Sequence, residues 1–215
     1  MGTVAVEKWT PERRRQLTRD TLIDAAAAVF VRRGFHGASL EEIAETAGFT
    51  RGAIYKNFTD KEELFLAVWE RINERTLVEF AELLDSGGTD FVSVSISAVA
   101  EKWREMQAGI RDFHILGWEF NLYLLRNPEI RERVTERRHE GAHRVAQFVE
   151  KRMADAGGKL PISADDLANI FLITSDGFSS AALTDPELAR LYEPFLDLLI
   201  HGMAAMQSEA ESPPA

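Results

Sequence analysis

The 215-residue sequence contains no cysteine, and none of its apolar runs reaches the roughly 18 residues of a membrane-spanning helix. The absence of cysteine excludes disulfides, thiolate zinc sites and cysteine nucleophiles. Glu7 and Lys8 interrupt a short, weakly apolar start, so the first residues do not form a signal-peptide pattern. We therefore expect a cytoplasmic protein without membrane contact. A content of 45% hydrophobic and 28% charged residues is typical of globular proteins and excludes a disordered chain.

Basic charge is scarce overall, and its distribution is uneven. The chain carries 25 basic and 35 acidic side chains, and this net charge of −10 would disfavour a nucleic-acid partner if it were spread evenly. Residues 1–59, however, hold nine basic and seven acidic side chains and so carry +2, which leaves −12 on the remainder. A slightly basic first quarter on an acidic remainder suits a protein that approaches phosphates with one end only.

Apolar residues recur at three- and four-residue spacings along nearly the whole chain, and no stretch alternates with period two for long enough to form a sheet. The sequence therefore predicts an all-α fold. Glycine and proline mark the breaks between helices. The expected helices cover residues 11–33, 40–47, 51–57, 61–84, 90–107, 110–126, 128–155, 164–183 and 186–207, and a disordered tail is expected from Ser208.

Capping residues support the first four of these helices. Thr10 is placed to cap the first helix, and Ser39 and Glu42 form a capping box in which each side chain satisfies a free backbone N–H. Thr50 is expected to cap the third helix, and Asp60 begins a second capping box at the fourth.

Residues 40–57 have the features of a helix-turn-helix. Gly48 permits a left-handed turn between two short helices, and Ala44 is small where those helices must approach closely. Apolar residues such as Ile43 and Ile54 are spaced to hold their crossing. A second helix held in this way presents its N-terminal side chains to a major groove.

The outward side chains of that second helix suit DNA. Arg51 can bond a guanine edge with two parallel N–H groups, and Thr50 and Gly52 allow close backbone approach. In the alternative interpretation, the aromatic and lysine side chains nearby are core or solvated residues. The residues predicted to bind DNA are Ser39, Leu40, Thr50, Arg51, Gly52, Ala53, Tyr55, Lys56, Asn57 and Lys61.

Residues 48–65 read Gly-Phe-Thr-Arg-Gly-Ala-Ile-Tyr-Lys-Asn-Phe-Thr-Asp-Lys-Glu-Glu-Leu-Phe and follow Gly-Phe-His-Gly-Ala-Ser-Leu-Glu-Glu-Ile-Ala at 34–44. This pattern resembles the TetR/AcrR family of bacterial repressors, and the resemblance covers about residues 13–70. It implies a three-helix DNA-binding domain at 1–59 and a larger helical effector-binding and dimerisation domain at 60–215. It also implies that residues 50–53 face bases and that Leu40, through its backbone, Tyr55, Asn57 and Lys61 hold phosphates. The family usually has histidine where this chain has Asn57.

Four arginines lie at 13, 14, 15 and 19, just before this motif. They could form a basic arm that enters a neighbouring minor groove. In the alternative interpretation they form a solvated helix face and pair with Glu12 and Asp20.

Glu119 and Asp176 are acidic residues in segments rich in apolar side chains. Burying a carboxylate is costly unless it is paired, hydrated or used. Such acids could line a pocket for a cationic, aromatic or amphipathic effector, and the residues predicted for it are Trp103, Phe113, Trp118, Glu119, Tyr123, Phe171 and Asp176. In the alternative interpretation, Glu119 pairs with Arg104 or Arg111 and Asp176 accepts a backbone N–H.

The last two predicted helices carry more apolar residues than one side of a small domain needs. We expect them to pack against their own copies as a four-helix dimer face. The residues predicted for this face are Phe178, Leu191, Phe195, Leu199 and Met203. A two-fold dimer would place its recognition helices about 34 to 36 Å apart and would require a palindromic operator.

Two competing functions remain open. His139, Glu140 and His143 match the H-E-x-x-H signature of zinc hydrolases, although flanking arginines disfavour a dication and no third ligand is evident. An architectural DNA-binding protein without an effector is the other, although the acidic remainder would repel DNA. We predict a homodimeric transcriptional regulator, and specifically a repressor that a small-molecule effector releases from double-stranded DNA. No catalytic residue, cofactor or metal is expected.

Overall fold

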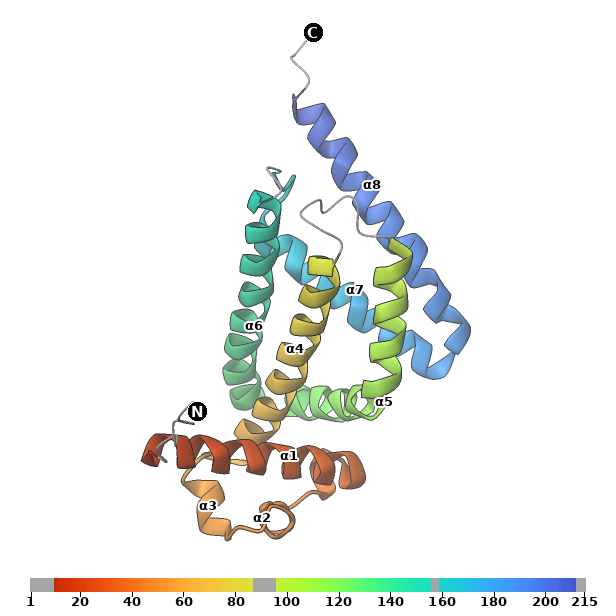
Figure 1. The fold of residues 1–215 in the computed structure, drawn as a ribbon. Coiled ribbons are helices and arrows are strands. Elements are labelled where there is room, and N and C mark those ends of the chain that lie inside the picture. Colours follow the sequence, from red (N-terminus) through yellow and green to blue (C-terminus); the bar gives the residue numbers. More distant parts are fainter. Residues whose placement is uncertain (1–9, 87–95, 156–158, 212–215) are drawn as a thin grey trace, which may run out of the picture. The chain divides into compact units, whose positions relative to one another are not determined.

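The computed structural model describes residues 10–86, 96–155 and 159–211. These residues are helical and contain no β-strand, which confirms the all-α prediction (Figure 1). None of the described helices combines the length and apolar character needed to cross a membrane. The chain divides into two compact units: an N-terminal unit, up to Ile72 together with Leu116–Tyr123, and a C-terminal unit, made of Asn73–Ile115 and the residues from Leu124 onward.

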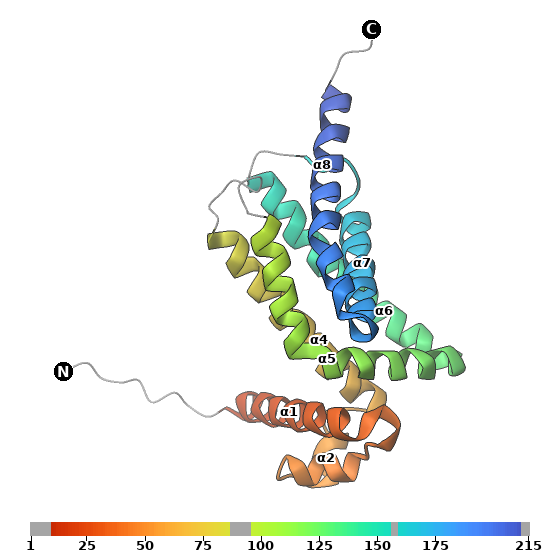
Figure 2. The same ribbon diagram turned by 90° about the vertical axis from the view of Figure 1, so that its right-hand side faces the viewer.

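The N-terminal unit is built on α1 (Pro11–Gly37), with α2 (Leu40–Thr46) packed against it and α3 (Arg51–Tyr55) packed against α2. Helix α2 lies along one side of α1 in both ribbon views (Figure 1, Figure 2). The unit also contains the first turns of α4 (Lys61–Ser86) and part of α5 (Ile96–Arg126). Its core consists of fully buried apolar side chains, among them Leu22, Val29, Phe30, Phe35, Ile43, Ile54, Phe58, Leu64, Phe65 and Phe120.

The division differs from the expected boundary after Thr59. Phe65 of α4 is 2% exposed, and its ring lies 5.3 Å from that of Phe30 and 4.1 Å from that of Phe120. The start of α4 and residues 116–123 therefore complete the same core as the helix-turn-helix.

The C-terminal unit contains α6 (Pro128–Asp155), α7 (Ala164–Thr184), the 3₁₀ helix η2 (Pro186–Leu191) and α8 (Tyr192–Glu211). Helix α6 packs on α7, and η2 contacts both α7 and α8. An aromatic cluster joins α5, α7 and α8: Trp103 stacks on Tyr192 at 4.1 Å, and Phe178 meets the Tyr192 ring at 5.4 Å.

Three expected helix boundaries are wrong. The helix expected over 186–207 is a 3₁₀ helix at Pro186–Leu191, and the α-helix begins at Tyr192. Helix α5 continues through Gly109 as one helix from Ile96, where a break was expected; a glycine inside a long helix costs only about 1 kcal/mol relative to alanine. Helix α8 continues to Glu211, so the expected disordered tail is wrong for 208–211. The expected segments at 90–95 and 212–215 lie outside the described residues.

The predicted caps are confirmed at three of four helices. The hydroxyl of Ser39 accepts the Glu42 N–H at 3.1 Å, and the Asp60 carboxylate accepts the N–H three residues later at 2.7 Å. Thr10 likewise accepts a backbone N–H at 3.2 Å. Thr50 forms no side-chain cap, so that expectation is wrong. The box at α2 is only half formed, because the Glu42 carboxylate bonds Arg32 and Arg33, which lower its pKa.

Replacing Ser39 by alanine is expected to lower the free energy of unfolding by about 1 kcal/mol, because the Glu42 N–H then loses its acceptor. Thr50→Ala is the matched control and should leave stability nearly unchanged, since Thr50 makes no side-chain cap. Urea unfolding followed by circular dichroism measures both. Equal losses in the two variants would contradict the role of Ser39.

Candidate nucleic-acid interface

The turn between α2 and α3 depends on Gly48. Its φ is +72°, and the following N–H of Phe49 donates to the Ala44 carbonyl at 2.9 Å. A Cβ at Gly48 would meet no atom within 4 Å, so backbone conformation rather than space requires glycine here. The predicted left-handed turn is confirmed.

Helix α3 is anchored on one side and exposed on the other. Ile43 and Ile54 are fully buried between α2 and α3, and Phe58 is 2% exposed just beyond. The interpretation of Phe58 as a core residue is therefore correct, whereas Tyr55 is 50% exposed and is not a core aromatic. The exposed side of this region carries Thr50, Arg51, Gly52, Tyr55 and Lys56, and Ala53 is half-buried.

Arg51 is held on the surface of α3 by weak interactions. Its guanidinium donates to the Tyr55 hydroxyl at 2.9 Å and forms an ion pair with Glu41 of α2, and both partners raise the pKa of Arg51. Exposed ion pairs contribute little to stability because water screens them. A DNA base could therefore replace Glu41 at little cost.

Lys61 is a predicted phosphate ligand, and it also connects the start of α4 to the end of α1 through hydrogen bonds. Its ammonium donates to the carbonyls of Phe35 at 2.9 Å and Ala38 at 3.2 Å, and it lies 3.5 Å from that of His36. Burial lowers the pKa of Lys61. A lysine has three donors, so a phosphate contact would require it to give up one of these carbonyls.

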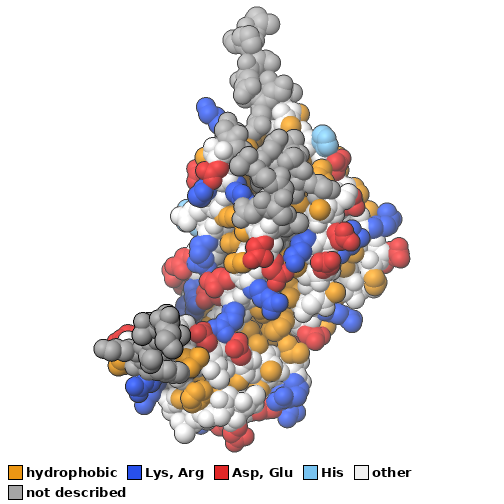
Figure 3. Space-filling model, in the orientation of Figure 1, with side chains coloured by type: hydrophobic (Ala, Val, Ile, Leu, Met, Phe, Trp, Pro, Cys, Tyr) orange, Lys and Arg blue, Asp and Glu red, His pale blue; other side chains and the backbone are white. Residues whose placement is uncertain are grey.

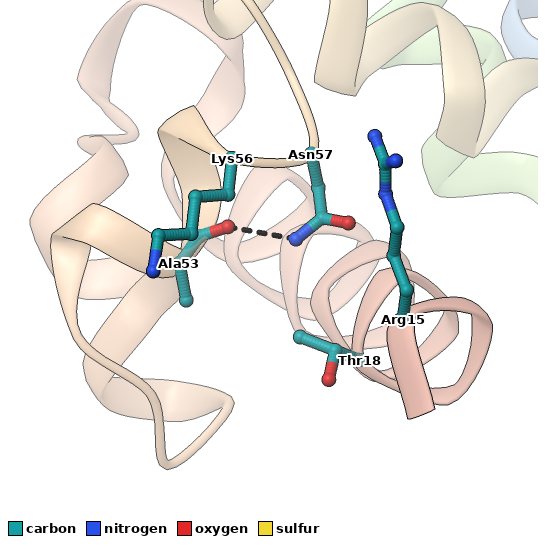
Figure 4. Close-up of a pocket in the computed structure, with 5 residues that line it drawn as sticks. All are labelled: Arg15, Thr18, Ala53, Lys56 and Asn57. Atoms are coloured by element: carbon teal, nitrogen blue, oxygen red, sulfur yellow. Dashed lines mark hydrogen bonds between the residues drawn. The ribbon is translucent and has the colours of Figure 1, made fainter. Parts of the chain in front are cut away.

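Asn57 is half-buried after α3 and faces α1 (Figure 4). Its side-chain amide donates to the Ala53 carbonyl at 2.8 Å, and its backbone carbonyl accepts a hydrogen bond from Arg19 at 2.7 Å. Its side-chain oxygen is buried and has no partner among the residues described. On the face drawn in Figure 3, basic and acidic side chains are interspersed. The ion pairs that each basic side chain forms with nearby acids therefore decide which lysines and arginines are available to DNA.

Glu119 lies in the N-terminal unit, where its carboxylate accepts the Phe35 N–H at 2.9 Å. The expected partners Arg104 and Arg111 are wrong. Gly34 has a φ of +70°, and a Cβ added to it would lie only 2.6 Å from an oxygen of this carboxylate. Tyr123, on the same part of α5, donates to Glu62 of α4.

The other predicted effector residues occupy different settings. Trp103 and Phe171 pack together in the aromatic cluster of the C-terminal unit. Phe113 is half-buried, and Trp118 is 39% exposed. The expectation of a buried acid at Asp176 is wrong, because its side chain is 58% exposed, 4.0 Å from the His114 imidazole. Desolvation lowers the pKa of His114 and outweighs the opposing effect of Asp176.

The residues predicted for a dimer face are only partly on the surface of the chain. Phe178 and Phe195 pack into the aromatic cluster of their own chain, Leu199 and Met203 are half-buried, and Leu191 is 37% exposed. Ile173 of α7 and Leu198 of α8 are far more exposed, at 70% and 74%. Sequence reasoning missed both, although the continuous apolar run at 170–173 exceeds one helix face and could have indicated the first.

In the H-E-x-x-H segment, both ring nitrogens of His143 form hydrogen bonds with other side chains. The His143 ring bonds Asp165 at 2.8 Å through one nitrogen and Gln147 at 3.1 Å through the other. Within the described ranges, no group of three or more histidine and acidic side chains could hold a metal ion. The third ligand that a zinc site requires is not found there.

Gly48→Ala is expected to lower the free energy of unfolding by about 1 to 2 kcal/mol, because an L side chain is strained at a positive φ. Gly52→Ala is the matched control inside α3, where a Cβ would meet only the Thr50 hydroxyl at 3.7 Å. It should stabilise the fold by up to about 1 kcal/mol and still weaken DNA binding. Urea unfolding and duplex titration separate the two effects. Loss of stability in Gly52→Ala would contradict this reading.

Comparison with known proteins agrees with this geometry. The model of a family described as bacterial regulatory proteins, tetR family, matches residues 22–68. The chain is 30% identical over 168 residues to the uncharacterised HTH-type transcriptional regulator YfiR of Bacillus subtilis, covering 75% of this chain and 78% of YfiR. It is 28% identical over 201 residues to the HTH-type transcriptional repressor BepR of Brucella suis, covering 91% of each. The solved SmeT–triclosan complex has a TM-score of 0.56 and 25% identity, covering 88% of this chain and 91% of that one. The chain belongs to the tetR family of bacterial regulatory proteins and is a DNA-binding transcriptional regulator.

Proposed function

We propose that this regulator is a cytoplasmic repressor that binds a palindromic operator as a homodimer and is released by a small-molecule effector. The observation that carries the proposal is the exposed polar side of α3, held at a fixed orientation by buried Ile43 and Ile54 and by the Gly48 turn. A helix of five residues anchored in this way presents its side chains without forming a core of its own.

The DNA-facing residues have different roles. Arg51 reads a guanine edge once it leaves Glu41, while Thr50, Gly52 and Ala53 let the backbone approach the bases. Tyr55 and Lys56 contact phosphates, and so do Ser39 and Leu40 at the start of α2 and Asn57 and Lys61 beyond α3.

A second copy of the chain covers the exposed apolar side chains of α7 and α8. Ile170, Ile173, Leu198 and Met206 are between 41% and 74% exposed on these two helices. An isologous two-fold contact buries the same patch on both chains and sets two recognition helices about 34 to 36 Å apart. Such a dimer requires a palindromic operator.

An effector acts through α5, because this helix contributes residues to both units. In the C-terminal unit the indole N–H of Trp103 is buried in the aromatic cluster and has no acceptor among the residues described. An aromatic effector with an acceptor oxygen suits this donor, and SmeT offers a precedent with triclosan. In the N-terminal unit, Glu119 and Tyr123 of the same helix hold Phe35 and Glu62. A shift of α5 therefore reaches α1 and α4, and a coupling of about 1 to 3 kcal/mol would change operator affinity roughly 5- to 150-fold.

The experiment that tests the proposal is selection of bound duplexes from a random pool at two salt concentrations. A palindrome should be enriched, and Arg51→Ala should lose both affinity and sequence preference. Tyr55→Phe is the matched comparison, since loss of a phosphate contact weakens binding to all duplexes similarly. The selected operator then allows small aromatic molecules to be screened for release of the protein from DNA.

Absence of an enriched site, together with binding that disappears on a modest rise in salt, would contradict the proposal. Equal loss of sequence preference in Arg51→Ala and Tyr55→Phe would contradict the assigned roles.

Ile173→Glu is expected to dissociate the dimer, since it buries an unpaired charge in the contact at a cost of about 3 to 5 kcal/mol. Leu125→Glu is the matched control, because Leu125 is 66% exposed on α5, a helix that is not part of the proposed face. Light scattering across a range of protein concentrations measures the molar mass. A dimer that survives Ile173→Glu, or that Leu125→Glu disrupts equally, would contradict the proposed face.

A further inference from the structure

A shallow depression lies between α1 and the end of α3 (Figure 4). It has a volume of about 420 Å³ and is lined by Arg15, Thr18, Ala53, Lys56 and Asn57. Arg15 and Thr18 come from the first turns of α1, whereas the other three belong to α3 or follow it. The depression thus joins α3 to the start of α1, whose arginines were expected to form either a basic arm or a solvated helix face.

The two cations of this depression lack acidic partners. Within the described part of the chain, neither Arg15 nor Lys56 forms an ion pair or a side-chain hydrogen bond. Of the two acids expected to pair with the α1 arginines, Asp20 is bound by Arg71 of α4, which also binds Asp24. Glu12 is exposed in the first turn of α1 and forms no ion pair with another described residue. The depression therefore carries positive charge that its own walls do not neutralise.

The wall opposite Arg15 is fixed in position and has an unused acceptor. Arg19 donates to the Asn57 backbone carbonyl at 2.7 Å and lies 4.2 Å from the centre of the Phe58 ring, which ties α1 to the residues after α3. The side-chain oxygen of Asn57 points toward the Arg15 side of the depression and has no partner among the described residues. A guanidinium has five donors, so Arg15 can bond this oxygen and an anion at the same time.

We propose that this depression binds one phosphate of the DNA backbone beside the groove that α3 reads, with Arg15 and Lys56 as its cationic ligands. The inference rests on the proposed DNA contact of α3 and adds a ligand from α1. Arg15 lies within the second turn of α1, so it reaches the backbone from a rigid helix and does not enter a minor groove as part of an arm. A contact of this kind sets the register of the protein on DNA and is independent of sequence.

The salt dependence of DNA binding tests this site. Each phosphate contact adds about 0.9 to the slope of log affinity against log salt concentration. A dimer holds two such phosphates, one on each chain, which together account for about 1.8 of the slope. Arg15→Ala and Lys56→Ala each remove one of the two cationic ligands from both sites, so each should reduce the slope by about one, equally on the selected operator and on a shuffled duplex. Arg15→Gln, which keeps most of the side-chain bulk, should reduce it by the same amount. Fluorescence anisotropy of labelled duplexes gives the slopes, and thermal unfolding checks that each variant is folded.

Arg14→Ala is the matched control, because Arg14 is also an exposed arginine of α1 with no side-chain partner among the described residues, and it does not line the depression. It should keep the wild-type slope. A wild-type slope in folded Arg15→Ala would overturn the proposal, and so would an equal reduction in Arg14→Ala, which would indicate long-range charge alone. The proposed repressor function fails separately, if the wild-type protein shows no preference for any operator over shuffled DNA.

Discussion

Phe35 joins three helices of the N-terminal unit at one residue. It is 1% exposed, and its ring lies 4.9 Å from that of Phe120, 5.2 Å from that of Phe65 and 4.9 Å from that of Tyr123. Its backbone N–H is bound by Glu119 of α5 and its carbonyl by Lys61 of α4. The position of α2, and through it of α3, follows from where α1 ends. The helix that we propose to face DNA, α3, therefore depends on contacts made by α4 and α5 at Phe35.

The kink at Gly34 makes this arrangement possible. Its φ of +70° turns the chain out of the α1 helix, and the space beside it is filled by the Glu119 carboxylate. A carboxylate among aromatic rings is stable only when its oxygens are hydrogen-bonded, and here the Phe35 N–H supplies a bond. Glu119, an acidic residue in an apolar part of α5, is thus explained by the space and the free N–H that the kink at Gly34 provides.

Features that depend on residues close together in the sequence could be predicted, whereas those that depend on distant residues could not. The cap at Ser39 and the turn at Gly48 involve residues three to five apart, so local pattern was enough to predict them. Glu119 and Phe35 are 84 residues apart, and no local pattern indicates such a partner. The apolar side chains at 170–173 and 178 likewise indicate a helix that packs against others, but not which of them pack within the chain and which, like Ile173, stay exposed.

The charge of the proposed DNA-binding surface also depends on contacts between residues far apart in the sequence. The chain carries a net charge of −10, and the sum over residues 1–59 is only slightly positive, yet Arg15 and Lys56 have no acidic partner among the described residues. Asp20, which lies near Arg15 in the sequence, is bound instead by Arg71, about 50 residues further along, together with Asp24. At physiological salt, charges more than about 8 Å apart are largely screened. A phosphate beside α3 is therefore affected mainly by the side chains that line its own site, and an acidic protein can bind DNA wherever its ion pairs leave a few cations free.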